Sequence, residues 1–297
     1  MRIFVTGATG FIGSAVVDEL LAAGHSVIGM TRSEAGAARL RAAGATAHFA
    51  DLDDLDSILR GVQQADAVIH TAFNHDFSKF AEHCANDRQV IEAMGEAVAA
   101  SGRPLVITSG TGLFASSGVL TEELVPDMDT VPFPRVATEV AAKGLMERGA
   151  NVSVVRLPPS VHGDGDHGFV PMLIAMAREK GVSAYIGEGL NHWPAVHRLD
   201  AARVFRLAAE RGVAARYHAT GEEGLPFRDI ATVIGRRLGL PIVSITSEQA
   251  AEHFGWFAGF AAVDNRASSQ LTRQVLNWEP KQPGLIVDLD RPQYFAQ

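Results

Sequence analysis

Short apolar runs alternate with amphipathic segments over the first half of the chain. Four of these runs are nearly continuous in apolar residues, as strands covered on both faces should be: Val27–Met30, Ala67–Thr71, Leu105–Thr108 and Val152–Leu157. Helical patterns lie between them, at residues 13–23, 34–43, 54–60, 86–101 and 136–148. Alternating strands and helices predict an α/β fold with a parallel, doubly wound sheet of the Rossmann type.

The pattern changes after Leu157. Pro158-Pro159 and a loop rich in glycine and aspartate at 162–168 interrupt the alternation. Further helices are predicted at 169–180, 199–211 and 227–239, and Tyr217–Thr220 is expected to return to the main sheet as a strand. We therefore expect a dinucleotide-binding domain over residues 1–157, completed by a strand near 215–220. Residues 158–297 would mostly form a smaller lobe that closes over the substrate side.

Three glycines stand between the first strand and the first helix. Ile3-Phe4-Val5 is a strand-like run, and Gly7, Gly10 and Gly13 follow it directly. Gly7 would permit the tight turn, Gly10 would let the backbone approach a pyrophosphate, and Gly13 would let the helix pack close to the strand. The helix N-terminus would then face the phosphates. This arrangement predicts dinucleotide binding, and the alternative is an ordinary glycine-rich turn.

The spacing Gly-x-x-Gly-x-x-Gly within Thr6–Gly13 resembles the short-chain dehydrogenase/reductase superfamily, in particular its extended and atypical branch, which includes NAD-dependent epimerases and dehydratases. Asp51-Leu52, residues 65–72 and Leu276–Pro280 fall where that branch has similar segments, so the resemblance covers nearly the whole chain. It implies that the cofactor lies against Gly7, Thr9, Gly10, Phe11, Ile12, Gly13, Arg32, Asp51, Leu52, Ala72, Phe73, Ser109 and Pro158.

The end of the second strand indicates which nicotinamide cofactor is bound. NAD-selective relatives carry an acid there, whereas this chain reads Thr31-Arg32-Ser33. A guanidinium matches a 2′-phosphate in charge and in bidentate geometry. We therefore expect NADP(H) in preference to NAD(H); the alternative is that Arg32 is only a solvated loop residue.

The usual catalytic residues of the superfamily are replaced. Its members use Ser or Thr together with a Tyr and a Lys that stand four residues apart on one helix. Here Arg135 takes the Tyr position and Glu139 the Lys position, while Gly110 replaces the Ser, with Ser109 and Thr111 beside it. Arginine stays protonated and is a poor proton donor. Arg135 therefore either stabilises charge on a substrate oxygen or forms an i,i+4 pair with Glu139.

Other polar groups are candidates for proton transfer and substrate contact. His75 follows the strand that ends near the nicotinamide in relatives, and His162 sits where relatives often have a Tyr. Both are candidate proton donors, although each is equally compatible with an ordinary loop histidine. Substrate contacts are expected from Asn74, His167, Tyr185, His192 and Trp193. No metal is expected, because the Asp164–His167 loop has no second cluster of ligands.

Bulk properties restrict the class of protein. The chain has 297 residues, 47% hydrophobic and 20% charged, which suits one large soluble domain or a domain with a lobe. A net charge of -8 argues against nucleic-acid binding. No apolar run approaches the roughly 20 residues of a membrane span, and the N-terminus does not resemble a signal peptide. The single cysteine, Cys84, excludes an internal disulfide and fits the cytoplasm.

Together these features predict an NADP(H)-dependent oxidoreductase that reduces a carbonyl or imine of a small, partly apolar substrate, with an unusual proton donor. A non-catalytic NADP-binding redox sensor or regulator is one alternative. A sugar-nucleotide epimerase or dehydratase is another, weakened by the missing Tyr and Lys. The resemblance also implies a homodimer, formed by the helices at 86–101 and 136–148. The substrate itself does not follow from the sequence.

Overall fold

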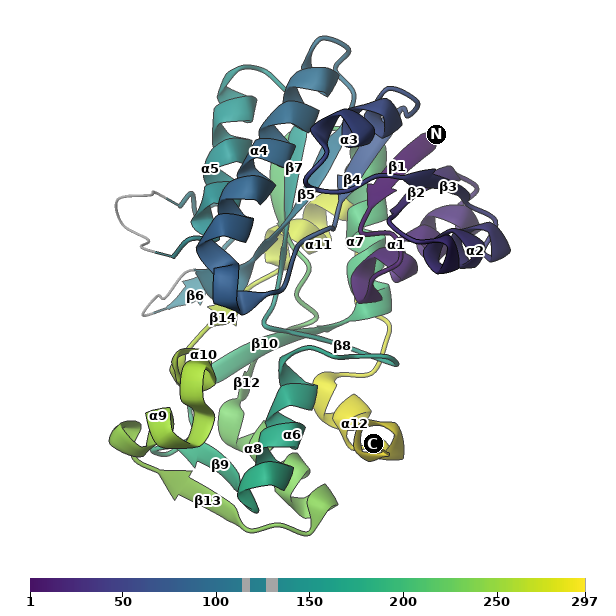
Figure 1. Cartoon of the computed structure of the whole chain (residues 1–297). Coiled ribbons are helices and arrows are strands. Elements are labelled where there is room, and N and C mark those ends of the chain that lie inside the picture. The colour runs from purple at the N-terminus through teal and green to yellow at the C-terminus, as the bar shows by residue number, and fades with distance from the viewer. Residues whose placement is uncertain (114–117, 127–132, 297) are drawn as a thin grey trace.

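A seven-stranded parallel sheet lies at the centre of the computed structural model, which describes residues 1–113, 118–126 and 133–296 (Figure 1). Its strand order is β11-β7-β5-β4-β1-β2-β3. The strands are β1 (Arg2–Thr6), β2 (Ser26–Thr31), β3 (Thr46–Phe49), β4 (Ala67–His70), β5 (Leu105–Gly110), β7 (Val152–Leu157) and β11 (Ala215–His218). The predicted doubly wound α/β fold is confirmed, and the sheet order reverses beside β1 as in dinucleotide-binding folds.

Helices cover both faces of this sheet (Figure 1). One face packs against α1 (Phe11–Ala22), α2 (Glu34–Ala42), α7 (Arg198–Arg211) and α11 (Gln270–Leu276). The other packs against α3 (Leu55–Val62), α4 (Phe80–Ala99) and α5 (Val136–Glu147). Side chains cap three of these helices: Ser33 Oγ accepts from the Gly36 N–H, Asp54 Oδ1 from the Ser57 N–H, and His197 Nδ1 from the Leu199 N–H. No helix in the described ranges is long and apolar enough to cross a membrane.

A helix and a strand illustrate how the structure differs from the sequence pattern. The helix predicted over 86–101 begins earlier, at Phe80, because a short turn, η1 (Phe77–Lys79), leads directly into it. The strand β3 was not predicted at all. It is the edge strand of the sheet, its residues are only partly buried, and it therefore lacks the continuous apolar run of the inner strands.

A smaller lobe lies beyond the carboxyl ends of the main strands (Figure 1). Its core includes Trp193, Phe227 and Phe257. Its strands are β8 (Ser160–His162), β10 (His192–His197) and β12 (Glu222–Pro226) in one sheet, and β9 (Ser183–Ile186) and β13 (Ile242–Ile245) in another. Its helices are α6 (Phe169–Lys180), α8 (Phe227–Leu238), α9 (Ser247–Phe254), α10 (Ala258–Ala262) and α12 (Leu285–Leu289). Short elements complete the chain: η2 (Thr111–Leu113), β6 (Val119–Leu120), η3 (Gly255–Phe257), β14 (Arg266–Ala267) and η4 (Pro292–Phe295).

The second half of the chain returns twice to the main sheet. α7 packs against α1, and β11 pairs in parallel with β7. Trp278, fully buried, joins the same core and donates its Nε1–H to the Asp200 carbonyl at 3.1 Å. The core on the α1 face is therefore built from both halves of the sequence.

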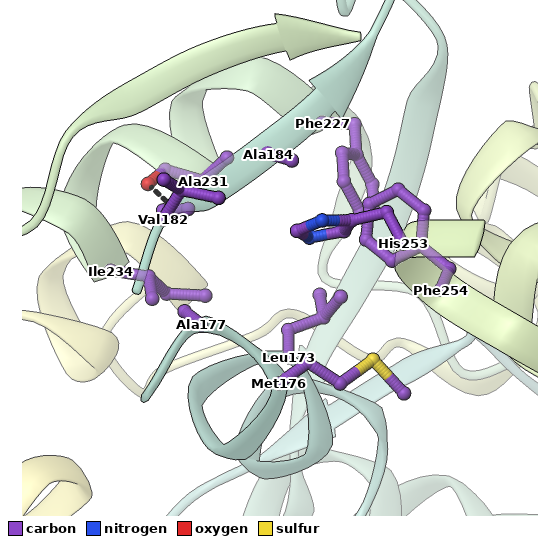
Figure 2. A pocket seen from close by; sticks show the side chains of 11 residues that line it. Leu173, Met176, Ala177, Val182, Ala184, Phe227, Ala231, Ile234, His253 and Phe254 are labelled. Atoms are coloured by element: carbon purple, nitrogen blue, oxygen red, sulfur yellow. Dashed lines mark hydrogen bonds between the residues drawn. The ribbon is translucent and has the colours of Figure 1, made fainter. Parts of the chain in front are cut away.

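The lobe itself contains a small apolar cavity between α6, β9, α8 and α9 (Figure 2). Its volume is about 10 Å³, room for roughly one water molecule. Ser183 Oγ, on its wall, already donates to the Ala231 carbonyl at 2.7 Å. This cavity is too small to hold a substrate, so it is not a candidate for the active site.

Candidate active site

A cleft of about 1470 Å³ is lined by the carboxyl ends of the main strands and by residues of the lobe. The cleft runs from the glycine turn to Phe260 in α10. All of the predicted cofactor residues line it: Gly7, Thr9, Gly10, Phe11, Ile12, Gly13, Arg32, Asp51, Leu52, Ala72, Phe73, Ser109 and Pro158. Position at the carboxyl ends of parallel strands is where α/β folds bind their ligands.

The glycine turn is shaped to receive a phosphate group. Gly7 has φ +64°, and a Cβ there would lie 2.7 Å from the Ala72 nitrogen. A Cβ on Gly13 would overlap the Gly7 carbonyl oxygen. Gly10 precedes α1, and no side chain in the described ranges caps that helix. The first N–H groups of α1 are therefore left for an anion, and these residues fit a dinucleotide pyrophosphate.

Arg32 and Asp51 lie together where the ribose and adenine would be bound. Arg32 Nη1 is 3.9 Å from Asp51 Oδ2, and the Arg32 side chain is 75% exposed. An exposed pair of this kind contributes little to stability. The guanidinium can therefore turn toward a phosphate without losing a strong partner.

A chain of buried hydrogen bonds connects β1 to the cleft through Asp87. His70 Nδ1 lies 2.7 Å from Thr6 Oγ1, and His70 Nε2 lies 3.0 Å from Asp87 Oδ1. Asp87 Oδ2 accepts hydrogen bonds from Thr138 Oγ1 and from Arg135 Nη1, both at 2.7 Å. Burial by itself raises the pKa of Asp87, but the Arg135 charge and the His70 and Thr138 hydrogen bonds outweigh it and lower that pKa. Asp87 is therefore a carboxylate, which can only accept hydrogen bonds. We accordingly place a proton on His70 Nε2, which donates to Asp87 Oδ1.

Arg135 reaches the cleft from the residue before α5. Its Nη2 donates to the Thr108 carbonyl at 3.3 Å, and its guanidinium carbon lies 3.9 Å from the centre of the Phe73 ring. The i,i+4 pair between Arg135 and Glu139, the alternative considered from the sequence, does not form. Arg135 precedes the first helical turn and bonds to Asp87 instead.

Glu139 is fully buried and faces away from the cleft, toward β7. It accepts from Arg156 Nε at 2.7 Å and lies 3.5 Å from Arg216 Nε. Arg156 also lies 3.2 Å from His218, whose pKa is lowered to about 4, first by burial and then by the Arg156 charge. Position 139, where the resemblance implied a Lys, therefore carries a carboxylate. Glu139 pairs with two arginines in the core beneath α5.

Histidine and aspartate side chains supply the titratable groups of the cleft. His75 lies beside Phe73, with ring centres 5.2 Å apart. Burial, followed by the charges of Arg135 and His167, lowers the pKa of His75 below 6.5, so it is mostly neutral at pH 7. Asp166 has a raised pKa, mainly because of burial. Among the described residues, no three His, Cys, Asp or Glu side chains gather as metal ligands would.

Four predicted site residues lie outside the cleft lining. Thr111 is buried and donates to Asn265 Oδ1 at 2.8 Å. His162 is buried outside the cleft lining, with Nδ1 2.8 Å from Asp288 Oδ2. Tyr185 packs in the lobe core, and His192 Nδ1 lies 3.0 Å from Asp264 Oδ1. In contrast, Asn74, His75, Arg135, His167 and Trp193 line the cleft.

Sequence reasoning missed several residues that shape the site. Asp87 and His70 carried no signal, because one sits inside a helical pattern and the other ends an apolar strand. His83 also lines the cleft, and its buried Nε2 has no partner within the described part of the chain. The aromatic residues Phe77 and Trp256 line it too. Their positions in aromatic-rich segments were a usable signal.

The glycine turn, the sheet order and the cleft agree with what comparison with known proteins shows. The model of the NAD dependent epimerase/dehydratase family matches residues 3–219. The chain belongs to this family. Within it, the chain is 53% identical over 296 residues to the uncharacterized protein C2A9.02 of Schizosaccharomyces pombe, covering 99% of this chain and 100% of that one.

Two further proteins that are similar to this chain have names that state an activity. The chain is 29% identical to the 2-alkyl-3-oxoalkanoate reductase of Stenotrophomonas maltophilia, covering 82% of this chain and 77% of that protein. The fold matches DesIV, a dTDP-glucose 4,6-dehydratase from Streptomyces venezuelae solved with NAD and TYD bound, with a TM-score of 0.76. That match has 21% identity and covers 100% of this chain and 97% of that one. The chain is therefore similar in sequence to a protein named as a reductase, and it shares its fold with a protein named as a dTDP-glucose 4,6-dehydratase.

Proposed function

We propose that this chain is an NADP(H)-dependent oxidoreductase of the atypical short-chain type, which reduces a carbonyl or imine carbon of a small, partly apolar substrate. One observation carries the proposal. The glycine turn, Arg135 and His75 all line a single cleft, so a cofactor and a polarising group share one space. We further propose a homodimer located in the cytoplasm.

Arg135 would act on the substrate oxygen. Asp87 and the Thr108 carbonyl each take one of its N–H groups, and guanidinium N–H groups remain for a ligand. Asp87 holds the guanidinium in place through a short bond, which favours a preorganised electrostatic role. When bound, NADPH supplies a hydride to the carbonyl carbon and becomes NADP⁺, while a proton joins the oxygen to give the alcohol.

His75 would supply that proton. It lines the cleft beside the Phe73 ring, which Arg135 also contacts. Both side chains therefore border the same ring, and the Arg135 charge contributes to the lowered pKa of His75. A lowered pKa makes the protonated histidine a stronger acid, which suits proton donation to an oxygen that is gaining negative charge. Solvent is the alternative donor.

NADP is proposed as the cofactor because of Arg32. It lines the cleft at the end of β2, and no carboxylate occupies the adjacent positions 30–33. The solved relative described above holds NAD. The preference of this chain for NADP therefore depends on its own residues and is tested separately below.

Loss of the usual Tyr and Lys also favours a second candidate, a sensor that binds NADP without turning over a substrate. The decisive experiment follows NADPH absorbance with a panel of carbonyl and imine compounds. We expect the parent protein to oxidise NADPH. We expect Arg135→Met to lose on the order of 100-fold in kcat/KM while still binding NADPH. Arg39→Met, which removes an exposed arginine of α2, is the matched control and should keep full activity. Tight NADPH binding without oxidation by any compound would favour the sensor.

A further inference from the structure

We propose that the substrate is an uncharged aromatic carbonyl or imine compound, held by Phe77, Trp256 and their aromatic neighbours. This inference rests on the proposed function and narrows it to a substrate class. The polar end of the substrate would lie at Arg135 and its ring system would extend toward the lobe.

Aromatic side chains are concentrated on the cleft. The chain has 15 Phe and 3 Trp, and among the described residues seven Phe and two Trp line this one cleft. They are Phe11, Phe73, Phe77, Phe80, Phe133, Phe169, Phe260, Trp193 and Trp256. Of these, Trp193 is fully buried in the lobe core and supports the lining from behind. Phe11 belongs to the glycine turn, and the others surround the region beyond Arg135. Aromatic faces and edges favour stacked and edge-to-face contacts with another ring.

The rings come from both sides of the cleft and meet there. Phe77, in η1, stacks on Trp256, in η3, with centres 5.0 Å apart and planes at 27°. Phe77 also stacks on Phe80 at 5.6 Å, and Phe133 approaches the Phe260 edge at 6.3 Å. Trp256 nevertheless remains 52% exposed. A large exposed ring that already lies parallel to a partner offers a surface on which a further flat ring can stack.

The charges around this region argue against a sugar nucleotide. Among the described residues that line the cleft, Arg32 and Arg135 are the only arginines, and no lysine is present. Arg32 lies at the adenine end, and Arg135 is already neutralised by Asp87. A diphosphate would therefore lose its hydration without gaining a cation, whereas a neutral carbonyl needs only N–H donors.

The test compares two aldehydes with the same carbon skeleton. The aromatic probe is 2-naphthaldehyde, and the saturated probe is decahydronaphthalene-2-carbaldehyde. Turnover is measured as kcat/KM with NADPH, and binding is measured by calorimetry with NADP⁺ present. We expect 2-naphthaldehyde to be preferred in both measurements. UDP-glucose at millimolar concentration should neither bind nor inhibit.

Variants of Trp256 connect the preference to the aromatic residues. Trp256→Leu should reduce the ratio of the two kcat/KM values by about 5-fold, because stacking is lost while an apolar side chain remains. Trp256→Phe should retain most of the preference. Because Trp256 is exposed, both variants should fold, and their thermal unfolding is compared with that of the parent.

The outcomes separate this inference from the proposed function. Equal turnover of both aldehydes, or inhibition by UDP-glucose, would overturn the aromatic substrate class and leave the reductase intact. Selective binding of 2-naphthaldehyde that Trp256→Leu abolishes, without NADPH oxidation, would support the aromatic site and overturn the reductase. An unchanged ratio in Trp256→Leu would also reject the inference.

Discussion

Asp87 Oδ2 accepts a 2.7 Å hydrogen bond from the Arg135 guanidinium, and the Asp87 side chain is only 2% exposed. The same carboxylate binds His70 and Thr138, so it ties β4, α4 and α5 together at the edge of the cleft. This ion pair determines both the charge and the orientation of Arg135, the group proposed to act on the substrate oxygen.

Removing the Asp87 charge should destabilise the fold. We expect Asp87→Asn to lower the free energy of unfolding by about 3 kcal/mol, because a buried guanidinium loses its counter-ion. Urea denaturation at pH 7 measures this. The control Glu92→Gln breaks an exposed pair with Arg88 and should cost about 0.5 kcal/mol or less. Because the pKa of Asp87 is lowered, its contribution is present at neutral pH and lost as the pH falls through that lowered pKa. A loss in Asp87→Asn no larger than that in Glu92→Gln would contradict this account.

Gly10 is the glycine of the turn at which an added methyl group disturbs the backbone least. Gly10 has φ -79° and ψ 177°, which alanine adopts readily, and an added Cβ would lie 3.2 Å from the Gly7 oxygen. We expect Gly10→Ala to weaken NADPH binding at least roughly 10-fold, because the methyl group occupies the space of the pyrophosphate. Tryptophan fluorescence titration measures the affinity. Gly144→Ala in α5, close only to the end of Arg148, should bind like the parent. Parent-like affinity in Gly10→Ala would mean that the pyrophosphate lies elsewhere.

Cofactor preference should depend on Arg32. The parent should bind NADPH more tightly than NADH, and Arg32→Ala should remove most of that gap, roughly 1–3 kcal/mol for a charge-assisted contact. Calorimetric titration with each cofactor gives both affinities. Arg39→Ala, on the exposed face of α2, keeps the net charge equal to that of Arg32→Ala and should preserve the gap. Equal affinity of the parent for both cofactors would reject the NADP assignment.

Proton donation by His75 has a definite pH signature. Since the pKa of His75 is lowered, the rate of carbonyl reduction should fall as the pH rises through a value below 6.5, and alcohol oxidation should rise over the same interval. His75→Ala should flatten both profiles and slow reduction on the order of 100-fold. His192→Ala, whose ring lies outside the cleft lining beside Asp264, is the control. Unchanged rate and profile in His75→Ala would point to solvent as the donor.

The proposed homodimer is tested by mass. The chain is 31.6 kDa, so light scattering at micromolar concentration should give twice that value. The proposed interface is formed by α4 and α5, and Arg88 and Lys143 are exposed on these helices. Arg88→Glu combined with Lys143→Glu should therefore weaken the dimer. A mass of one chain for the parent at all concentrations would reject the proposal.

The sheet and the glycine turn were predictable because both depend on neighbouring residues. Val152–Leu157 is a strand in the pattern and in the structure, and Gly7 and Gly13 have the steric reasons expected of them. The helix limits were less exact, as at Phe80, because a preceding turn extends α4.

The hydrogen-bonded side of the site was not predictable from local pattern. Arg135 donates a hydrogen bond to Asp87, which is 48 residues away in the sequence. Glu139 forms an ion pair with Arg156, which lies in a buried strand. An i,i+4 rule describes only neighbours on one exposed helix, and Glu139 is fully buried. Likewise Phe77 contacts Trp256 only in the folded chain, because the lobe lies beyond the carboxyl ends of the main strands.

The return of α7 and β11 to the main sheet has a consequence for biosynthesis. The first 157 residues leave the ribosome before α7, which completes the cover of one face of their sheet, has been synthesised. Phe205 in α7 and Trp278 both belong to the core on that face. At roughly 5–20 residues per second, about 3 to 12 seconds separate the completion of β7 from that of β11. During that interval α1 and α2 cover that apolar face only in part, and the edge of the sheet at β7 is unpaired. We therefore expect that residues 1–157 cannot complete their fold until α7 and β11 have been synthesised.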